Sequence, residues 1–171
     1  PDGNWTDEGF TTRYSAELAN SLGNLVNRSL SMLNRYRDGV LAPPHDDLAA
    51  EARATRDKLV TELEANQLQA GLQTIWSFIA RMNQYVDETA PFKLAKDESQ
   101  AERLGEVLYN LAEGCRMVAV WLQPFLPTTS ARIFGQLNLP DEQVNIAESD
   151  WGELPEGHQA GKPEPLFPRR D

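Results

Sequence analysis

Apolar residues recur at spacings of three, four and seven in four long stretches of the chain, and each stretch ends at a proline, a glycine or a polar turn. Such spacing gives a helix one apolar stripe, so each stretch predicts an amphipathic helix. The first helix is expected over Arg13–Arg37 and ends at Asp38-Gly39; the second follows Pro43-Pro44 and has Asp46 or Asp47 as its N-cap. Their stripes consist of Leu18, Leu22, Leu25, Val26 and Leu33, and of Leu48, Ala52, Leu59 and Leu63.

The third and fourth helices have the most regular patterns. Their stripes consist of Leu68, Leu72, Ile75, Ile79, Met82 and Val86, and of Leu104, Leu108, Leu111, Cys115, Val118 and Leu122. The third helix must end before Pro91, because the residue before a proline is driven out of the helical region, and the fourth ends at Pro124. A short fifth helix, capped by Thr128 or Thr129, carries Ile133, Phe134 and Leu137.

Beyond Leu139 the helical period is lost, and prolines recur at positions 140, 155, 163, 165 and 168. The apolar anchors of this tail are Trp151, Leu154, Leu166 and Phe167. The pattern predicts an all-α fold: an antiparallel bundle of four long helices plus a short fifth, followed by an irregular Pro-rich C-terminal tail. We divide the chain into a connector (1–12), a helical bundle (13–139) and a tail expected to pack back on the body (140–171).

Composition limits what this bundle can be. With 171 residues, 40% of them hydrophobic, the chain can bury one core but is short for a two-domain enzyme. It begins with Pro1 in a polar stretch, so we expect an upstream part to be missing. No apolar run approaches the roughly 20 residues of a membrane span. The lone Cys115 cannot form an internal disulfide, which favours a reducing, cytoplasmic setting.

The formal charge of −10 argues at first against a nucleic-acid partner. The charge is segregated, however. Positions 141–157 hold six acidic residues and no basic one, whereas Arg13–Arg37 holds four arginines and only one acidic residue, Glu17, for a local charge of +3. The average therefore hides a basic first helix.

Opposite the buried stripe, the first helix presents a polar face of Asn20, Asn24, Asn27, Ser31 and Asn34. Asparagine is a poorer helix former than alanine by roughly half a kcal/mol, so this face needs a reason. One interpretation is a surface that meets a neighbouring domain. The other is that the amides face nucleic-acid bases. In that case Asn24 and Arg28, one turn apart, would reach the same base with complementary donors and an acceptor.

A second candidate follows the third helix at Ala90-Pro91-Phe92-Lys93, with Lys96 nearby. Pro91 fixes the backbone, the Phe92 ring can stack on a splayed-out base, and Lys93 and Lys96 can hold phosphates. The alternative is that Phe92 plugs the end of the bundle.

The sequence gives little support for a metal site, a catalytic site or a cofactor site. His45 and His158 lie far apart without ligand partners at metal spacing, so no metal site is expected. No nucleophile elbow, Gly-rich phosphate loop or Glu-x-x-His pair is present. We expect no catalysis and no cofactor in this part of the protein.

Five segments together resemble the anticodon-binding domain of methionyl-tRNA synthetases, which are class I aminoacyl-tRNA synthetases. They are RYSAELAN (13–20), LGNLVNR (22–28), NQYVDETAPFKLAK (83–96), LQPFLP (122–127) and GHQAGKPEPLFP (157–168). The resemblance implies a bundle that reads the anticodon CAU, most closely its cytosine. It places base contacts on Asn24 and Arg28 and the stacking ring, after Pro91, on Phe92. The family ordinarily has tryptophan where this chain has Phe92, which implies a smaller stacking area and no indole N–H.

The resemblance further implies that the parent enzyme joins methionine to its tRNA using ATP in protein biosynthesis. ATP with Mg²⁺, and a zinc-bearing insertion, would belong to the missing catalytic part, so this chain alone should not be active. The expected partners are the tRNA for methionine and the upstream catalytic domain, with no DNA and no membrane. Two alternatives stay open: the anticodon domain of another class I synthetase, or a helical protein-interaction bundle that binds no RNA.

Overall fold

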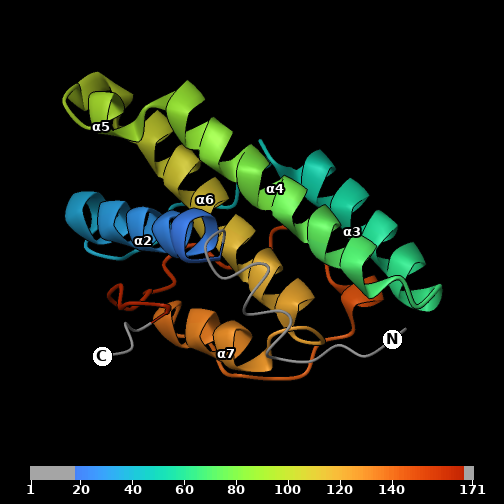
Figure 1. Cartoon of the computed structure of the whole chain (residues 1–171). Coiled ribbons are helices and arrows are strands. Elements are labelled where there is room, and N and C mark those ends of the chain that lie inside the picture. The colour runs from blue at the N-terminus through green and yellow to red at the C-terminus, as the bar shows by residue number, and fades with distance from the viewer. Residues whose placement is uncertain (1–17, 168–171) are drawn as a thin grey trace.

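In the computed structural model, which describes residues 18–167, four long helices pack around one apolar core (Figure 1). The long helices are α2 (Gly23–Arg37), α3 (Ala49–Glu64), α4 (Leu68–Thr89) and α6 (Ala101–Leu122). The shorter elements are η1 (Leu18–Leu22), α5 (Pro91–Leu94), η2 (Glu98–Gln100), α7 (Pro127–Gln136) and η3 (Ile146–Glu148). The predicted all-helical bundle is confirmed, with the short α5 as an addition. The predicted start of the first helix at Arg13 lies outside the described residues.

Helix α6 is the centre of the bundle. Every residue from Val107 to Leu122 is buried, because α2, α4, α7 and the C-terminal segment surround the helix. The sequence predicted one stripe on this helix, and the structure buries both faces. A helix covered on all sides tolerates apolar residues at every position. Near its end, the Trp121 ring packs edge-on against Phe78, with ring centroids 5.0 Å apart.

Two predicted helix caps are wrong. Helix α3 begins at Ala49 without a side-chain cap, and the preceding Leu48 N–H instead donates to Asn110 Oδ1 on α6 at 3.0 Å. Helix α7 begins at Pro127, before both threonines. A proline at the first helical position needs no capping partner, since it has no N–H to satisfy.

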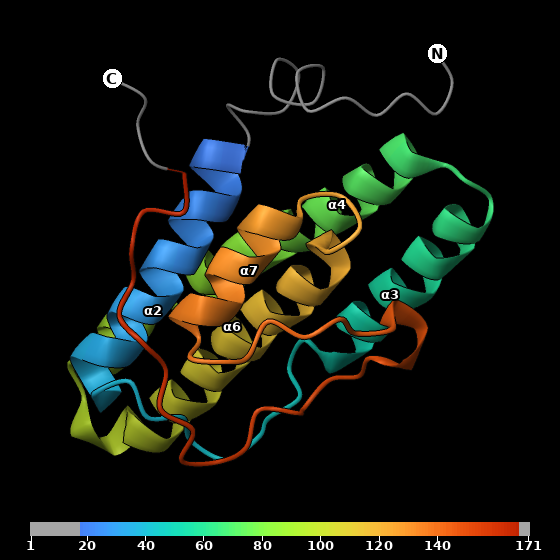
Figure 2. The ribbon, with the colours of Figure 1, turned by 90° about the horizontal axis from the view of Figure 1, so that it is seen from below.

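Residues 140–167, which we call the strap, run from the end of α7 to α3, then back beneath α6 and along the flank of α2 (Figure 2). Three of their apolar side chains, Trp151, Leu154 and Leu166, are buried in the common core, and Phe167 is partly buried against it. The Trp151 indole donates to the His45 carbonyl at 2.7 Å, and the Tyr109 hydroxyl donates to the Leu154 carbonyl at 2.8 Å. The strap therefore folds onto the bundle itself.

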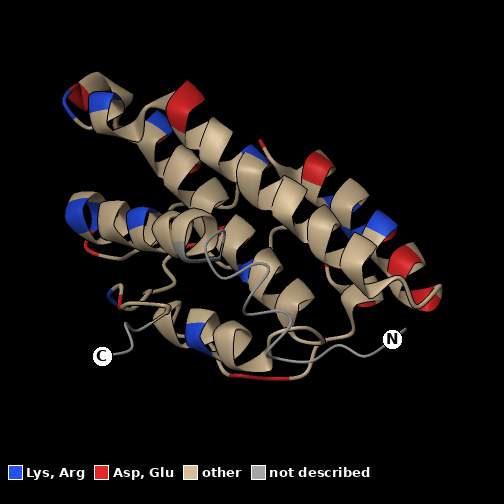
Figure 3. Cartoon of the chain, in the orientation of Figure 1, with Lys and Arg blue, Asp and Glu red and all other residues tan. Residues whose placement is uncertain are grey.

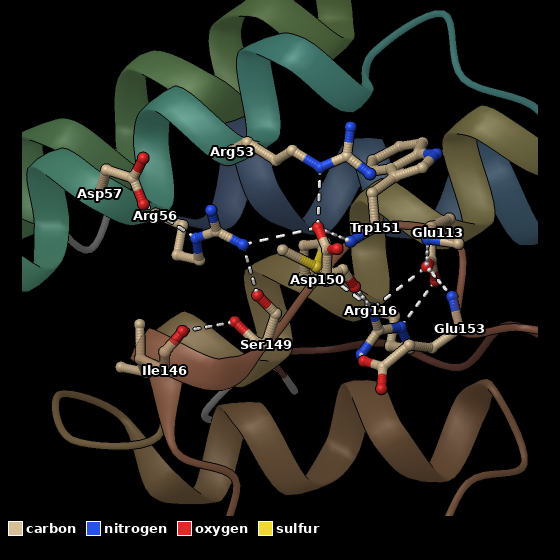
Figure 4. A network of polar contacts seen from close by, with 12 residues as sticks. Arg53, Arg56, Asp57, Glu113, Arg116, Ile146, Ser149, Asp150, Trp151 and Glu153 are labelled. Carbon is tan, nitrogen blue, oxygen red and sulfur yellow. Dashed lines mark hydrogen bonds and ion pairs between the residues drawn. The ribbon is translucent and has the colours of Figure 1, made fainter.

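A buried ion pair holds the middle of the strap (Figure 4). Glu113 of α6 is fully buried and accepts from Arg116 Nε at 2.6 Å. Its other oxygen accepts from the backbone N–H groups of Gly152 and Glu153. Arg116 also donates to the Asp150 carbonyl at 2.6 Å. This network joins strap to core through charge as well as apolar contact.

A second polar cluster joins the start of α3 to the end of α4 and the start of α6. Asp47 accepts from the Tyr85 hydroxyl at 2.7 Å and from Arg103 at 2.8 Å, and His45 lies 3.3 Å from it. Partial burial tends to raise the pKa of Asp47. The hydrogen bonds from Tyr85 and Arg103 and the nearby positive charges outweigh burial and hold that pKa below its usual range.

A carboxylate whose pKa is lower in the folded state stabilises the fold above its unfolded pKa of about 4, and this contribution is lost as the pH falls through the folded value. We therefore expect Asp47→Asn to lower the free energy of unfolding near neutral pH and to flatten its decline from about pH 5 to about pH 2. Urea unfolding at several pH values measures both. The control is Asp46→Asn, because no hydrogen bond or ion pair to the Asp46 carboxylate exists within residues 18–167. If the free energy of unfolding declines equally with acid in the Asp47→Asn variant and in the wild type, the Asp47 carboxylate does not stabilise the fold as described.

Candidate nucleic-acid interface

Helix α2 places Asn24 and Arg28 on its outer face. Its inner face is fixed in the core by Leu25, Leu30 and Leu33, all fully buried. Asn24 and Arg28 are both exposed and one turn apart, as their spacing predicted. Among residues 18–167, neither side chain has a hydrogen-bond or ion-pair partner.

The amide face is shorter than the sequence predicted. Asn20 and Asn27 are exposed, and Asn27 accepts from the Ser31 hydroxyl at 3.2 Å. Asn34 is only partly exposed. Its amide donates to the Leu30 carbonyl and to the Gly161 carbonyl of the strap, both at 2.9 Å. The strap thus covers one end of the face and leaves Asn24 and Arg28 open.

The turn after α4 presents the Phe92 ring. Ala90 adopts the left-handed conformation with φ 44°, a strain of roughly 1–2 kcal/mol for a residue with a Cβ, and it ends α4. Pro91 is buried and begins α5, which seats the turn against the bundle. Phe92 is 49% exposed, the one large apolar side chain so exposed within residues 18–167. The ring is therefore not a core plug.

Lys93 and Lys96 are exposed in the same turn and near the same end of the bundle as the C-terminal end of α2 (Figures 1 and 2). Asn24 and Arg28 lie in the first half of α2, and Arg28 stands nine positions before the last residue of that helix, Arg37, which is about 14 Å along the axis. No hydrogen bond joins either of them to α5 in the described part of the chain. The two candidate sites therefore lie apart on the bundle.

Charge is distributed unevenly over the bundle. On α2 the charged positions are all basic, whereas α3 carries both signs and the loop after α7 carries acidic positions (Figure 3). Not every cation on α2 is available, because Arg37 Nε donates to the Val40 carbonyl at 2.9 Å and braces the turn that ends the helix. Arg37 keeps its charge, but the exposed guanidinium groups of α2 are those of Arg28 and Arg35; Arg13, which was counted in the predicted charge, lies outside the described residues.

One cluster of side chains that could bind a metal ion lies within residues 18–167. His45, Asp46 and Asp47 bring three potential ligand atoms within 4.8 Å of one another. Asp47 is already engaged by Tyr85 and Arg103, and His45 Nδ1 lies against Asp47. Only the Asp46 carboxylate of this cluster has no partner among residues 18–167, which is too few ligands for a zinc site. No helix in the described part of the chain is long and apolar enough to cross a bilayer.

The chain is similar to known proteins in both sequence and structure. Residues 38–170 match the family described as the anticodon binding domain of methionyl tRNA ligase. The chain is 39% identical over 99% of its length to the methionine–tRNA ligase of Caldanaerobacter subterraneus, and 42% identical over 98% to that of Bacillus subtilis. It spans only 28% and 26% of those two proteins.

Among solved structures, the apo form of Mycobacterium tuberculosis methionyl-tRNA synthetase matches 98% of the chain with a TM-score of 0.80 and 30% identity. The chain covers 35% of that structure. The family match begins after α2, so it includes Pro91 and Phe92, whereas Asn24 and Arg28 fall only within the longer alignments. The sequence resemblance is thereby confirmed, and this chain belongs to the family of methionyl-tRNA ligase anticodon-binding domains.

Proposed function

We propose that this chain recognises the methionine anticodon CAU as part of a methionine–tRNA ligase. The observation that carries the proposal is the exposed pair Asn24 and Arg28, whose polar groups have no partner within residues 18–167 of a chain of this family. An amide offers both a donor and an acceptor, and a guanidinium offers a fork of donors. Together they suit the edge of one unpaired base, the cytosine of CAU.

The α5 turn supplies the second contact. The half-exposed Phe92 ring would stack on another splayed-out anticodon base, with Pro91 fixing the direction of the turn. Lys93 and Lys96 would neutralise phosphates beside it, which makes the affinity fall with rising salt. The six acidic residues of positions 141–157 lie on the part of the strap that runs along α3 and beneath α6 (Figure 2), so the net charge of −10 is not concentrated beside Asn24 and Arg28.

Ligation itself would take place in the rest of the enzyme. Methionine activation with ATP and Mg²⁺, and zinc binding, would belong to the catalytic part of the ligase. The partners we propose are the tRNA for methionine and that catalytic domain, acting in cytoplasmic protein synthesis.

Filter binding of the chain to tRNA transcripts with exchanged anticodons tests the proposal. We expect CAU transcripts to bind best. Equal affinity for CAU and other anticodons would overturn it. A preference for the anticodon of valine, isoleucine, leucine or cysteine would assign the chain to another class I synthetase, an outcome that the family match makes unexpected.

Phe92→Trp tests the stacking contact. Base–aromatic stacking contributes roughly 1–3 kcal/mol per base, and an indole offers more area than a phenyl ring. We expect this variant to bind a CAU anticodon stem–loop up to about fivefold more tightly, and Phe92→Leu to bind at least about fivefold more weakly. Fluorescence anisotropy measures both.

Because Phe92 is half exposed, neither change should move the melting temperature by more than about 2 °C. A lower melting temperature for Phe92→Trp with unchanged affinity would mean that the ring packs inside the bundle, contrary to the proposal.

A further inference from the structure

The turn that ends α2 is paired with the strap. Leu41 N–H donates to the His158 carbonyl at 3.0 Å, and Ala160 N–H donates to the Gly39 carbonyl at 2.8 Å. Gly39 has φ 80°, and a Cβ there would meet the Gln159 amide, so the two segments approach closely because this residue is glycine. We call residues 38–41 and 157–161 the clasp.

Asn34 extends the clasp onto the helix itself. Its Nδ2 carries two hydrogens, and each has an acceptor at 2.9 Å: the Leu30 carbonyl in the preceding turn and the Gly161 carbonyl of the strap. Gly161 N–H in turn donates to the Gln136 carbonyl of α7 at 2.9 Å. One side chain therefore ties the outer side of α2, through the strap, to α7.

The tie matters because of what lies further along α2. The inner side of the helix is fixed by apolar contacts, which are non-directional and allow small rotations about the helix axis. Asn24 and Arg28 make no polar contact within residues 18–167, so among these residues their placement depends on the orientation of the helix that carries them. Hydrogen bonds from Asn34 to a fixed strap carbonyl supply the directional restraint that apolar packing lacks.

We propose that Asn34 is a positioning residue for anticodon recognition: it holds α2 in the rotation at which Asn24 and Arg28 meet the same base. The inference rests on the proposed function. It predicts that breaking the tie reduces both the affinity for RNA and the discrimination between bases, whereas breaking a neighbouring tie of the strap reduces only stability.

The test compares Asn34→Ala and Asn34→Leu with Gln136→Ala. Gln136 is buried, and its side chain bonds the Glu164 backbone through both its oxygen and its nitrogen, so its loss loosens the strap on α7 but leaves the Asn34–Gly161 bond in place. For each variant, fluorescence anisotropy gives the affinity for a CAU stem–loop and for the same loop with its cytosine replaced by uracil. Thermal melting is followed in parallel.

Both Asn34 variants should bind the CAU loop roughly three- to tenfold more weakly and lose part of the ratio between the two loops. Gln136→Ala should melt at a lower temperature with the affinity ratio of the wild type. Unchanged affinity and ratio in the Asn34 variants, or equal losses in Gln136→Ala, would overturn the inference. A wild-type chain that binds both loops equally would instead overturn the proposed function.

Discussion

Replacement of Arg116 by alanine is expected to lower the free energy of unfolding by about 3–5 kcal/mol, because it leaves Glu113 as a buried charge without its cationic partner. Glu113 is 0% exposed and bonds Arg116 through both oxygens, at 2.6 and 3.1 Å. Burial tends to lower the pKa of Arg116, but Glu113 outweighs burial and keeps that pKa above its usual range. The two backbone N–H groups of the strap that also bond Glu113 cannot replace a full positive charge. Urea unfolding followed by circular dichroism measures the loss.

Arg53→Ala is the matched control for this prediction. It removes another arginine–carboxylate contact to the strap, the 2.8 Å pair with Asp150, but that pair is about half exposed on both sides. Exposed pairs contribute roughly 0–1 kcal/mol, so Arg53→Ala should be nearly neutral. If the two variants are equally stable, the Glu113–Arg116 pair does not anchor the strap.

Arg28→Ala is expected to weaken binding of a CAU stem–loop by about 10- to 100-fold, since hydrogen bonds from a charged group contribute roughly 1.5–3 kcal/mol each. The fold should be unaffected, because the Arg28 side chain is exposed and makes no polar contact within residues 18–167. Isothermal titration calorimetry gives the affinity, and circular dichroism verifies the fold. Lys58→Ala removes the same charge from an exposed position on α3 and should change the affinity by less than about twofold.

The alternative of a protein-interaction bundle makes the opposite prediction for α2. If the amide face docks onto another protein domain, Arg28→Ala and Asn24→Ala should leave tRNA charging by the complete ligase unchanged. A loss of charging with an intact fold would exclude that alternative.

Most of the helical framework follows from local rules, and the exceptions have physical causes. Periodic apolar residues placed α3, α4 and α7 to within a few residues, since each buries one face. The pattern underestimated how much of α6 is buried. It predicted one apolar stripe, whereas the structure covers the helix on every side. The predicted caps at Asp46 or Asp47 were wrong because Asp47 is used instead to bind Tyr85 and Arg103, which are distant in sequence.

In the candidate site too, features set by the local sequence could be predicted, and contacts between distant residues could not. The exposure of Asn24 and Arg28 followed from their helical angle, which needs only the local sequence. The role of Asn34 did not, because its partner Gly161 is 127 residues away. The buried pair left a visible signal that sequence reasoning missed. Glu113 and Arg116 are the charged residues inside the otherwise uncharged run from Val107 to Leu122. A charge pair three residues apart in such a run indicates a buried network.

The affinity ratio between a CAU anticodon stem–loop and the same loop with only its cytosine replaced tests the account most directly, measured by fluorescence anisotropy on this chain at one fixed salt concentration. A hydrogen-bonded base that is replaced typically costs 1–3 kcal/mol, so we predict a ratio of roughly 5- to 150-fold. In Arg28→Ala the ratio should fall towards one. A wild-type ratio of one, with both loops bound equally well, would contradict recognition of the anticodon by α2.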